Sequence, residues 1–274
     1  MDLSQALEIV TRTDPGMVRS HNEDSVYAAS ACGLAVLADG MGGYNAGEVA
    51  SGMTVALLGS ELAKTLETQE INGFTPEKKR VSHALLETEI ARTNSTIYQS
   101  AQSQPQYAGM GTTLVMALFY DDKMTTAHIG DSRLYRLRGE EFAQVTRDHS
   151  LLQEQIDSGI ITPEQAKFSQ NKNLVTRALG VDPEVEPEIR DYDTQPGDIY
   201  LFCSDGLNDM VDDEEIGMTL QALSANLELC ATQLVQMAND NGGRDNVSVI
   251  LVRIKSAYPA PRRGLFARLF AWLK

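Results

Sequence analysis

Apolar and polar residues follow the short periods of β-strands in seven places along this chain. Each run is five to nine residues long and is rich in β-branched or alternating residues, which favours strands. The links Asp121-Asp122-Lys123 and Arg138-Gly139-Glu140 are typical of hairpin turns, so we expect at least part of the sheet to be antiparallel. The predicted strands are 7–13, 34–39, 112–120, 124–129, 133–137, 198–203 and 246–254.

Helical periodicity, with apolar residues three and four positions apart, appears in pairs of segments between these strands. Strands mixed with paired helices in one chain indicate an α+β sandwich. The predicted helices are 46–66, 76–102, 214–223 and 227–239, with two short ones around Pro163 within 151–169.

The composition is that of one enzyme-sized domain. The chain has 274 residues, of which 42% are hydrophobic, enough to bury a sizeable core. Its first residues lack the basic and apolar regions of a secretory signal, and no run of about 18 apolar residues predicts a membrane span, so we expect a cytoplasmic protein. The cysteines Cys32, Cys203 and Cys230 lie far apart in apolar surroundings, which favours reduced thiols over disulfides. We expect a monomer.

Charge divides the chain into a domain, 1–255, and a tail, 256–274. The net charge of −15 argues against nucleic acid as a partner, because phosphate backbones require basic patches. The tail has four basic residues and no acidic one, and its apolar residues from Leu265 to Leu273 fall at helical spacing after Pro259 and Pro261. This basic amphipathic segment either docks on the domain or contacts a membrane surface or a protein partner through 262–274.

Acidic residues stand at the edges of predicted strands or in Gly-rich turns, where a fixed backbone can hold several carboxylates in one cleft. Oxygen ligands without paired Cys or His are typical of Mg²⁺ or Mn²⁺ rather than Zn²⁺. The pattern therefore predicts two-metal hydrolysis. The acidic residues are Glu23, Asp24, Asp39, Asp131, Asp205 and Asp245.

Around these acids the chain carries, in order, Gly16, Arg19, Asn22-Glu23-Asp24, Ala38-Asp39-Gly40-Met41-Gly42-Gly43, Gly111-Thr112-Thr113, Gly130-Asp131-Ser132-Arg133, Ser204-Asp205-Gly206-Leu207 and Asp245-Asn246. Any one of these motifs alone is typical of a turn, and their order is the specific signal. Over residues 8–254 the chain resembles the metal-dependent protein phosphatase family, in particular bacterial serine/threonine phosphatases of the 2C type. The resemblance implies a four-layer α-β-β-α sandwich of two mainly antiparallel sheets flanked by helix pairs, with a flap at about 150–180 beside the active site.

The resemblance also implies roles for individual residues. The carboxylate of Asp39 would bridge two Mn²⁺ or Mg²⁺ ions, and the carbonyl of Gly40 would bind one of them. Two further carboxylates, Asp205 and Asp245, would complete one shell, and with Asp39 they form the catalytic set. Asp24, together with Glu23, would bind the other ion either directly or through bound waters.

Two further roles follow from the resemblance. Asp131 would help Asp205 to hold a third, weaker metal; the alternative is a turn aspartate that orders Ser132 and Arg133. A planar guanidinium can contact two phosphate oxygens at once, so Arg19 would bind the substrate phosphate. Met41 stands where some members of the family have a histidine, and it cannot donate a proton.

The activity implied is hydrolysis of phosphoserine and phosphothreonine in proteins by a water that the two metals activate. The partners implied are phosphorylated proteins, in particular a bacterial Ser/Thr kinase and its substrates. The alternative is a catalytically silent regulator of the same fold that binds phosphoproteins. Because Asp39, Asp205 and Asp245 are all present, we favour the enzyme. A weaker third hypothesis is an unrelated hydrolase of small phosphomonoesters.

Overall fold

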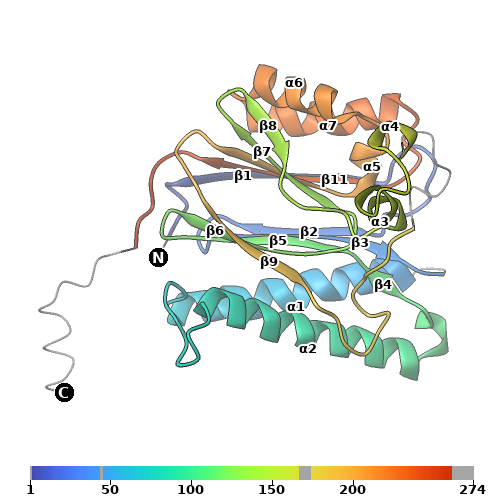
Figure 1. The fold of residues 1–274 in the computed structure, drawn as a ribbon, viewed down its shortest axis with the longest axis horizontal. Helices are drawn as coiled ribbons and strands as arrows, with labels where there is room; N and C mark the ends of the chain where they lie inside the picture. The colour runs from blue at the N-terminus through green and yellow to red at the C-terminus, as the bar shows by residue number, and fades with distance from the viewer. Residues whose placement is uncertain (1, 44–45, 167–173, 261–274) are drawn as a thin grey trace, which may run out of the picture.

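The computed structural model describes residues 2–43, 46–166 and 174–260, which form two stacked β-sheets with helices on both outer faces (Figure 1). In spatial order, the first sheet contains β1 (Leu7–Asp14), β11 (Val247–Ile254), β10 (Ile199–Cys203), β7 (Arg133–Arg138) and β8 (Glu141–Gln144). The second contains β2 (Asp24–Ala29), β3 (Leu34–Met41), β5 (Leu114–Tyr120), β6 (Lys123–Ile129) and β9 (Glu188–Asp193), with β4 (Gly111–Thr112) paired to β3. All of these strand pairs are antiparallel.

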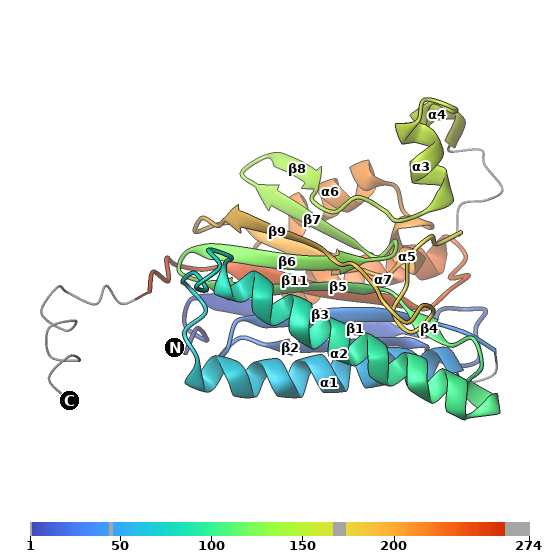
Figure 2. The same cartoon turned by 60° about the horizontal axis from the view of Figure 1, so that its bottom comes forward.

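Long helices cover the outer face of each sheet. Helices α1 (Ala46–Thr68) and α2 (Val81–Ser103) lie on the second sheet, while α6 (Asp213–Leu223) and α7 (Leu227–Asp240) lie on the first (Figure 1). The predicted four-layer α-β-β-α sandwich is therefore confirmed. The remaining helices are η1 (Pro105–Tyr107), α3 (Leu151–Asp157), α4 (Pro163–Ala166) and α5 (Asp205–Asn208). Of these, α3 and α4 project from one end of the sandwich (Figure 2).

Three apolar layers hold these four layers of secondary structure together. Along β3, Leu34 and Val36 pack toward α1 and α2, while Ala35 and Leu37 pack between the two sheets. A third cluster joins the first sheet to α6 and α7. Since both faces of β3 are buried, its sequence is continuously apolar rather than alternating.

The three strands that the sequence pattern missed, β2, β8 and β9, all lie at sheet edges. Edge strands expose one row of backbone groups and often carry charged side chains, which weakens the apolar signal. The clearest case is β9, which carries four charged residues among its six. One predicted strand, 112–120, is divided at Thr113 into β4 and β5.

The prediction of a helix over 76–102 was wrong at its N-terminal end. Helix α2 begins at Val81 because the residues before it close a tight turn, in which Thr75 N donates to Lys79 O at 2.7 Å. Lys78 has a φ of 64°, a left-handed conformation that cannot continue a helix. By contrast, the hairpin prediction at Asp121 and Asp122 is confirmed, since their φ values of 49° and 55° suit a tight turn between β5 and β6.

Residues at the start of the tail pack on the domain. The Tyr258 side chain is buried, and its hydroxyl forms a 2.6 Å hydrogen bond with that of Thr194. Ala260 N donates to Asp121 Oδ1 at 2.8 Å. The predicted amphipathic segment, 262–274, lies outside the described residues.

All three cysteines are free thiols, as predicted. Among the described helices, none combines the length and the apolar character that crossing a bilayer requires.

A buried histidine pair connects β6 to the segment before α3. The rings of His128 and His149 lie 4.7 Å apart at 37°, and neither ring nitrogen of His128 has a hydrogen-bond partner. Burial, followed by the charges of His149 and Arg177, lowers the pKa of His128 to about 3 from its ordinary 6.5. On the other side, Glu188 Oε2 lies 3.7 Å from His149 Nε2. The folded protein therefore holds His128 neutral.

This pair predicts acid sensitivity. The unfolded chain protonates His128 below pH 6.5 and the folded protein only near pH 3, so stability falls as the pH drops through that window. In His128→Phe, the free energy of unfolding should depend less steeply on pH, by up to about 1.4 kcal/mol per pH unit. Urea unfolding between pH 4 and pH 7 measures it, with the exposed His21→Gln as control. Parallel curves for wild type and His128→Phe would contradict the prediction.

Candidate active site

The antiparallel pairing brings the predicted acidic residues to one end of the sandwich. Strands β3, β6 and β10 finish at the end where β2, β7 and β11 begin. This is the end marked by α5 and β4 in Figure 1. Asp24 and Asp39 are opposite one another on β2 and β3, Asp131 lies between β6 and β7, Asp205 begins α5, and Asp245 precedes β11.

Asp39 is the electrostatic centre of this group. Burial and the negative charges of Asp24, Asp205, Asp131 and Asp245 raise its pKa well above the ordinary value. The pKa of Asp205 is raised in the same way, by burial and then by neighbouring carboxylates. Mutual repulsion of this kind is relieved by protonation or by a bound cation, so the group is suited to hold positive charge.

Two further carboxylates have raised pKa values. Burial, opposed by hydrogen bonds from Ser248 and Ser204, raises the pKa of Asp24 to about 6. For Asp131, burial and then the charge of Asp148 raise the pKa to about 6. Both side chains are less than 10% exposed, which makes their ionised forms costly without a counter-ion.

Two buried carboxylate oxygens are suited to coordinate a cation. Ser204 Oγ donates to Asp24 Oδ2 at 2.8 Å, whereas Asp24 Oδ1 has no hydrogen-bond partner. Glu23 Oε1 is also buried without a partner. Buried polar atoms are nearly always satisfied, so these oxygens indicate a ligand position. Oxygen donors of this kind suit Mg²⁺ or Mn²⁺.

The site is an open ligand set rather than a closed cage. Within residues 2–43, 46–166 and 174–260, no group of three or more carboxylate, imidazole or thiol side chains is arranged to hold a metal ion by itself. Mg²⁺ usually keeps several waters and also accepts carbonyl oxygens, so a complete protein cage is not required. The residues present fit hard cations bound partly through water.

Close backbone approach explains why position 40 is a glycine. A Cβ on Gly40 would collide with the carbonyl of Gly47 and would lie 2.7 Å from the carbonyl oxygen of Glu23. A Cβ on Gly47 would in turn lie 2.7 Å from Glu23 Oε1. The two glycines let β3, the start of α1 and the segment before β2 meet at the site.

Asn246 is a site residue to which the sequence assigned no role. Its Oδ1 accepts from Glu23 N at 2.7 Å, and its Nδ2 donates to Pro15 O at 3.0 Å and to His21 O at 2.9 Å. One side chain thus holds the segment that carries Arg19 and Glu23 against the start of β11. The only signal in the sequence was its place beside Asp245.

Arg19 lies at the rim of the carboxylate group. Its Nη2 is 2.7 Å from Asp245 Oδ2, and half of its side chain is exposed. Burial alone would lower the pKa of Arg19, but Asp245, Glu23 and Asp205 raise it on balance. The guanidinium is therefore held at the site and is accessible to a ligand from solvent.

The predicted flap, 150–180, is described in part, since 167–173 lie outside the described residues. Two backbone hydrogen bonds join its start to residues 174–176: Leu151 N donates to Leu174 O at 2.9 Å, and Thr176 N donates to His149 O at 2.8 Å. The residue before the predicted flap contacts the loop between β6 and β7 that carries Asp131, because His149 N donates to Gly130 O at 2.8 Å.

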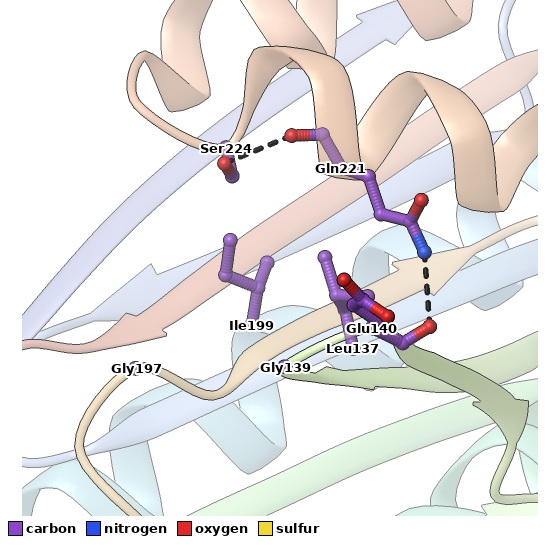
Figure 3. A pocket seen from close by; sticks show the side chains of 7 residues that line it. All are labelled: Leu137, Gly139, Glu140, Gly197, Ile199, Gln221 and Ser224. Atoms are coloured by element: carbon purple, nitrogen blue, oxygen red, sulfur yellow. Dashed lines mark hydrogen bonds between the residues drawn. The ribbon is translucent and has the colours of Figure 1, made fainter.

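A hollow of about 360 Å³ lies elsewhere, at the opposite end of β10 (Figure 3). It is lined by Leu137, Gly139, Glu140, Gly197, Ile199, Gln221 and Ser224. Gln221 Nε2 donates to Glu140 O at 3.0 Å across its edge. Only one carboxylate lines it, so it is not a competing metal site.

Comparison with known proteins identifies the family. A model for protein phosphatase 2C matches residues 18–246. The serine/threonine protein phosphatase PstP of Mycobacterium tuberculosis is 40% identical over 248 residues, which are 90% of this chain and 45% of PstP. The chain thus spans about half the length of that relative. Protein phosphatase PhpP of Streptococcus pneumoniae is 38% identical over 251 residues, 90% of this chain and 97% of PhpP.

A solved structure agrees with these relatives. The crystal structure of the PstP catalytic domain in complex with two manganese ions has a TM-score of 0.78 at 40% identity, and the match covers 90% of this chain and 98% of that one. The family model spans most of the chain, and the relatives match nearly all of it. The chain belongs to the protein phosphatase 2C family.

Proposed function

We propose that this protein is a metal-dependent serine/threonine phosphatase that hydrolyses phosphoserine and phosphothreonine in proteins. The observation that carries the proposal is the gathering of four aspartates, Asp24, Asp131, Asp205 and Asp245, near Asp39. The Arg19 guanidinium lies beside Asp245. The named activity of PstP and PhpP, and the two manganese ions in the PstP catalytic domain, support the same conclusion.

The residues divide into groups by the oxygen atoms that they offer. The proposed bridge between two Mn²⁺ or Mg²⁺ ions is the Asp39 carboxylate. The other proposed ligands are the carbonyl of Gly40, Asp205 and Asp245 on one side, Asp24 with Glu23 on the other, and Asp131 with Asp205 at a third, weaker position. When bound, such ions lower the pKa of a coordinated water and neutralise charge on phosphate oxygens.

The chain's own groups bind and orient the substrate. Arg19 offers a planar pair of N–H donors to two phosphate oxygens and offsets the repulsion between phosphate and carboxylates. Asn246 fixes the segment that carries Arg19, and Ser204 fixes one oxygen of Asp24. Met41 cannot protonate the leaving alkoxide, so the protein supplies no acid from that position.

A catalytically silent regulator of the same fold is the less favoured alternative. Such a protein would be expected to lack at least one of Asp39, Asp205 and Asp245. All three are present and lie at the same end of the sandwich.

A substrate panel tests the proposed specificity. Phosphothreonine and phosphoserine peptides would be compared with small metabolite phosphomonoesters under equal Mn²⁺, by phosphate release. We expect kcat/KM to be higher for the peptides by at least about tenfold, because peptide contacts add binding energy beyond the phosphate. Equal or higher kcat/KM for the metabolites would contradict a protein phosphatase.

The expected physiological partners are a bacterial Ser/Thr kinase and the proteins it phosphorylates. A kinase transfers phosphate to the side chains that this enzyme would dephosphorylate, so the two activities would oppose each other. We further propose that the protein is cytoplasmic and monomeric, and that its tail brings it to the inner face of the membrane. The support for the last point is the tail's composition, basic and apolar with no acid.

Deleting 262–274 tests the role of the tail. We expect the full chain to bind phosphatidylserine vesicles and the shortened chain to lose that binding, while activity on a soluble phosphopeptide stays within about twofold. Vesicle sedimentation measures binding, and neutral phosphatidylcholine vesicles are the control. If the full chain does not bind anionic vesicles, the result would favour docking of the tail on the domain instead.

A further inference from the structure

Two buried hydroxyls connect the centre of the proposed metal site to its third position. Thr113, between β4 and β5, and Ser132, after Asp131, are both at most 1% exposed. Their Oγ atoms form a 2.7 Å hydrogen bond. Neither hydroxyl is among the proposed metal ligands.

On the Asp39 side, two hydrogen bonds join Thr113 to the backbone of Asp39, and a third joins Thr112 to it. Asp39 N donates to Thr113 Oγ1 at 3.0 Å, and Thr113 N donates back to Asp39 O at 2.9 Å. The neighbouring Thr112 Oγ1 also donates to Asp39 O, at 2.8 Å. The backbone on both sides of the proposed bridging carboxylate is therefore tied to this point of the second sheet.

On the Asp131 side, the loop is pressed against the same threonine. Gly130 has a φ of 104°, and a Cβ on it would lie 2.7 Å from Thr113 Cγ2. In addition, His149 Nδ1 accepts from Gly130 N at 3.2 Å. The loop between β6 and β7 thus contacts both Thr113 and His149. Through the hydroxyl of Ser132 it is hydrogen-bonded to Thr113, which in turn contacts Asp39.

We propose that Thr113 and Ser132 are positioning residues, whose hydroxyl pair fixes Asp131 relative to Asp39 and thereby sets the affinity of the third metal position. The inference rests on the proposed metal site. In it, Thr113 and Ser132 hold the metal-binding residues in place but do not bind metal themselves. Groups that orient ligands typically change metal affinity by about 10- to 100-fold when removed.

The two hydroxyls make different contacts, so their loss should have different effects. Ser132→Ala leaves the bond from Asp39 N to Thr113 intact and removes only the hydroxyl contact between the Asp131 loop and Thr113. Thr113→Val keeps the shape of the side chain but leaves Asp39 N and Ser132 without their partner. The first change should weaken only the third position, and the second should weaken the positions that Asp39 holds as well.

The experiment is a Mn²⁺ titration of the full chain by calorimetry, with free Mn²⁺ measured in parallel by electron paramagnetic resonance. For Ser132→Ala we expect the weakest site to lose about tenfold in affinity, with the tighter sites changed less than about threefold. Thr113→Val should weaken all sites, and Thr113→Ser, which keeps the hydroxyl, should restore the tighter ones. The matched control is Thr126→Val, which removes a buried hydroxyl that donates to Arg190 O at 3.3 Å.

Each outcome separates this inference from the proposed function. A wild type that binds no Mn²⁺ would overturn both, and one that binds only two ions would overturn the inference alone. The inference also fails if Ser132→Ala leaves the weakest site unchanged or weakens every site equally, or if Thr113→Ser behaves like Thr113→Val. Ser132→Ala, the smaller change, carries the test if Thr113→Val does not fold.

Discussion

Asp39→Asn is expected to lower the turnover of a phosphothreonine peptide by about 1,000-fold or more, because several kcal/mol of transition-state stabilisation depends on the bound metals. An amide keeps the size of the side chain but offers one neutral oxygen where, in the proposed site, two cations would share an anionic carboxylate. The measurement is steady-state phosphate release at saturating Mn²⁺. Asp193→Asn, a highly exposed partner of Lys123 on β9, is the matched control and should retain full activity.

The same substitution should make the metal-free protein more stable. In the folded chain Asp39 is half-buried, and desolvation and neighbouring like charges raise its pKa, so keeping its carboxylate ionised is costly without a bound cation. Removing that charge should raise the Tm in EDTA while lowering the additional stabilisation that Mn²⁺ provides. Wild-type turnover, or a Tm that falls in EDTA, would contradict the place of Asp39 at the centre of the site.

Arg19→Ala is expected to raise the KM for a phosphopeptide by about 10- to 100-fold, consistent with about 1.5–3 kcal/mol for hydrogen bonds to a charged group. If Arg19 contacts the phosphate both before and during the reaction, as we propose, kcat should change less than KM. Arg12→Ala, a surface change at a residue paired with Glu228, is the control. Arg19→Lys should recover only part of the loss, since an ammonium cannot form the planar pair of hydrogen bonds.

An unchanged KM in Arg19→Ala would remove Arg19 from the substrate site. A fall in kcat with no change in KM would assign it to the transition state or to the orientation of Asp245, which it contacts at 2.7 Å.

Sequence patterns predicted the parts of the fold that burial dictates. β3, β5, β10 and β11 are buried on both faces, so their apolar runs are long and unmistakable. The edge strands β2, β8 and β9 were missed because edge strands expose one row of backbone groups and often carry charged side chains, which weakens the apolar signal. The fourth edge strand, β1, was predicted. The start of α2 was misplaced because the turn before it, in which Lys78 has a left-handed backbone conformation, does not change the pattern of apolar residues.

The site shows the same division. The acidic residues could be found because each stands where a strand begins or ends, and antiparallel pairing brings such positions together. The residues that support them could not, because their partners are distant in sequence. Asn246 binds the backbone of Pro15 and His21, and the Ser204 hydroxyl binds Asp24. Only a folded chain reveals such contacts.

The most direct test of the central claim is dephosphorylation of a phosphothreonine peptide by the purified full chain, first in EDTA and then with Mn²⁺ restored, beside Asp39→Asn. We predict activity that disappears with chelation, returns with Mn²⁺ and is absent from the variant. Full activity in EDTA, or none with any divalent metal, would contradict a metal-dependent phosphatase.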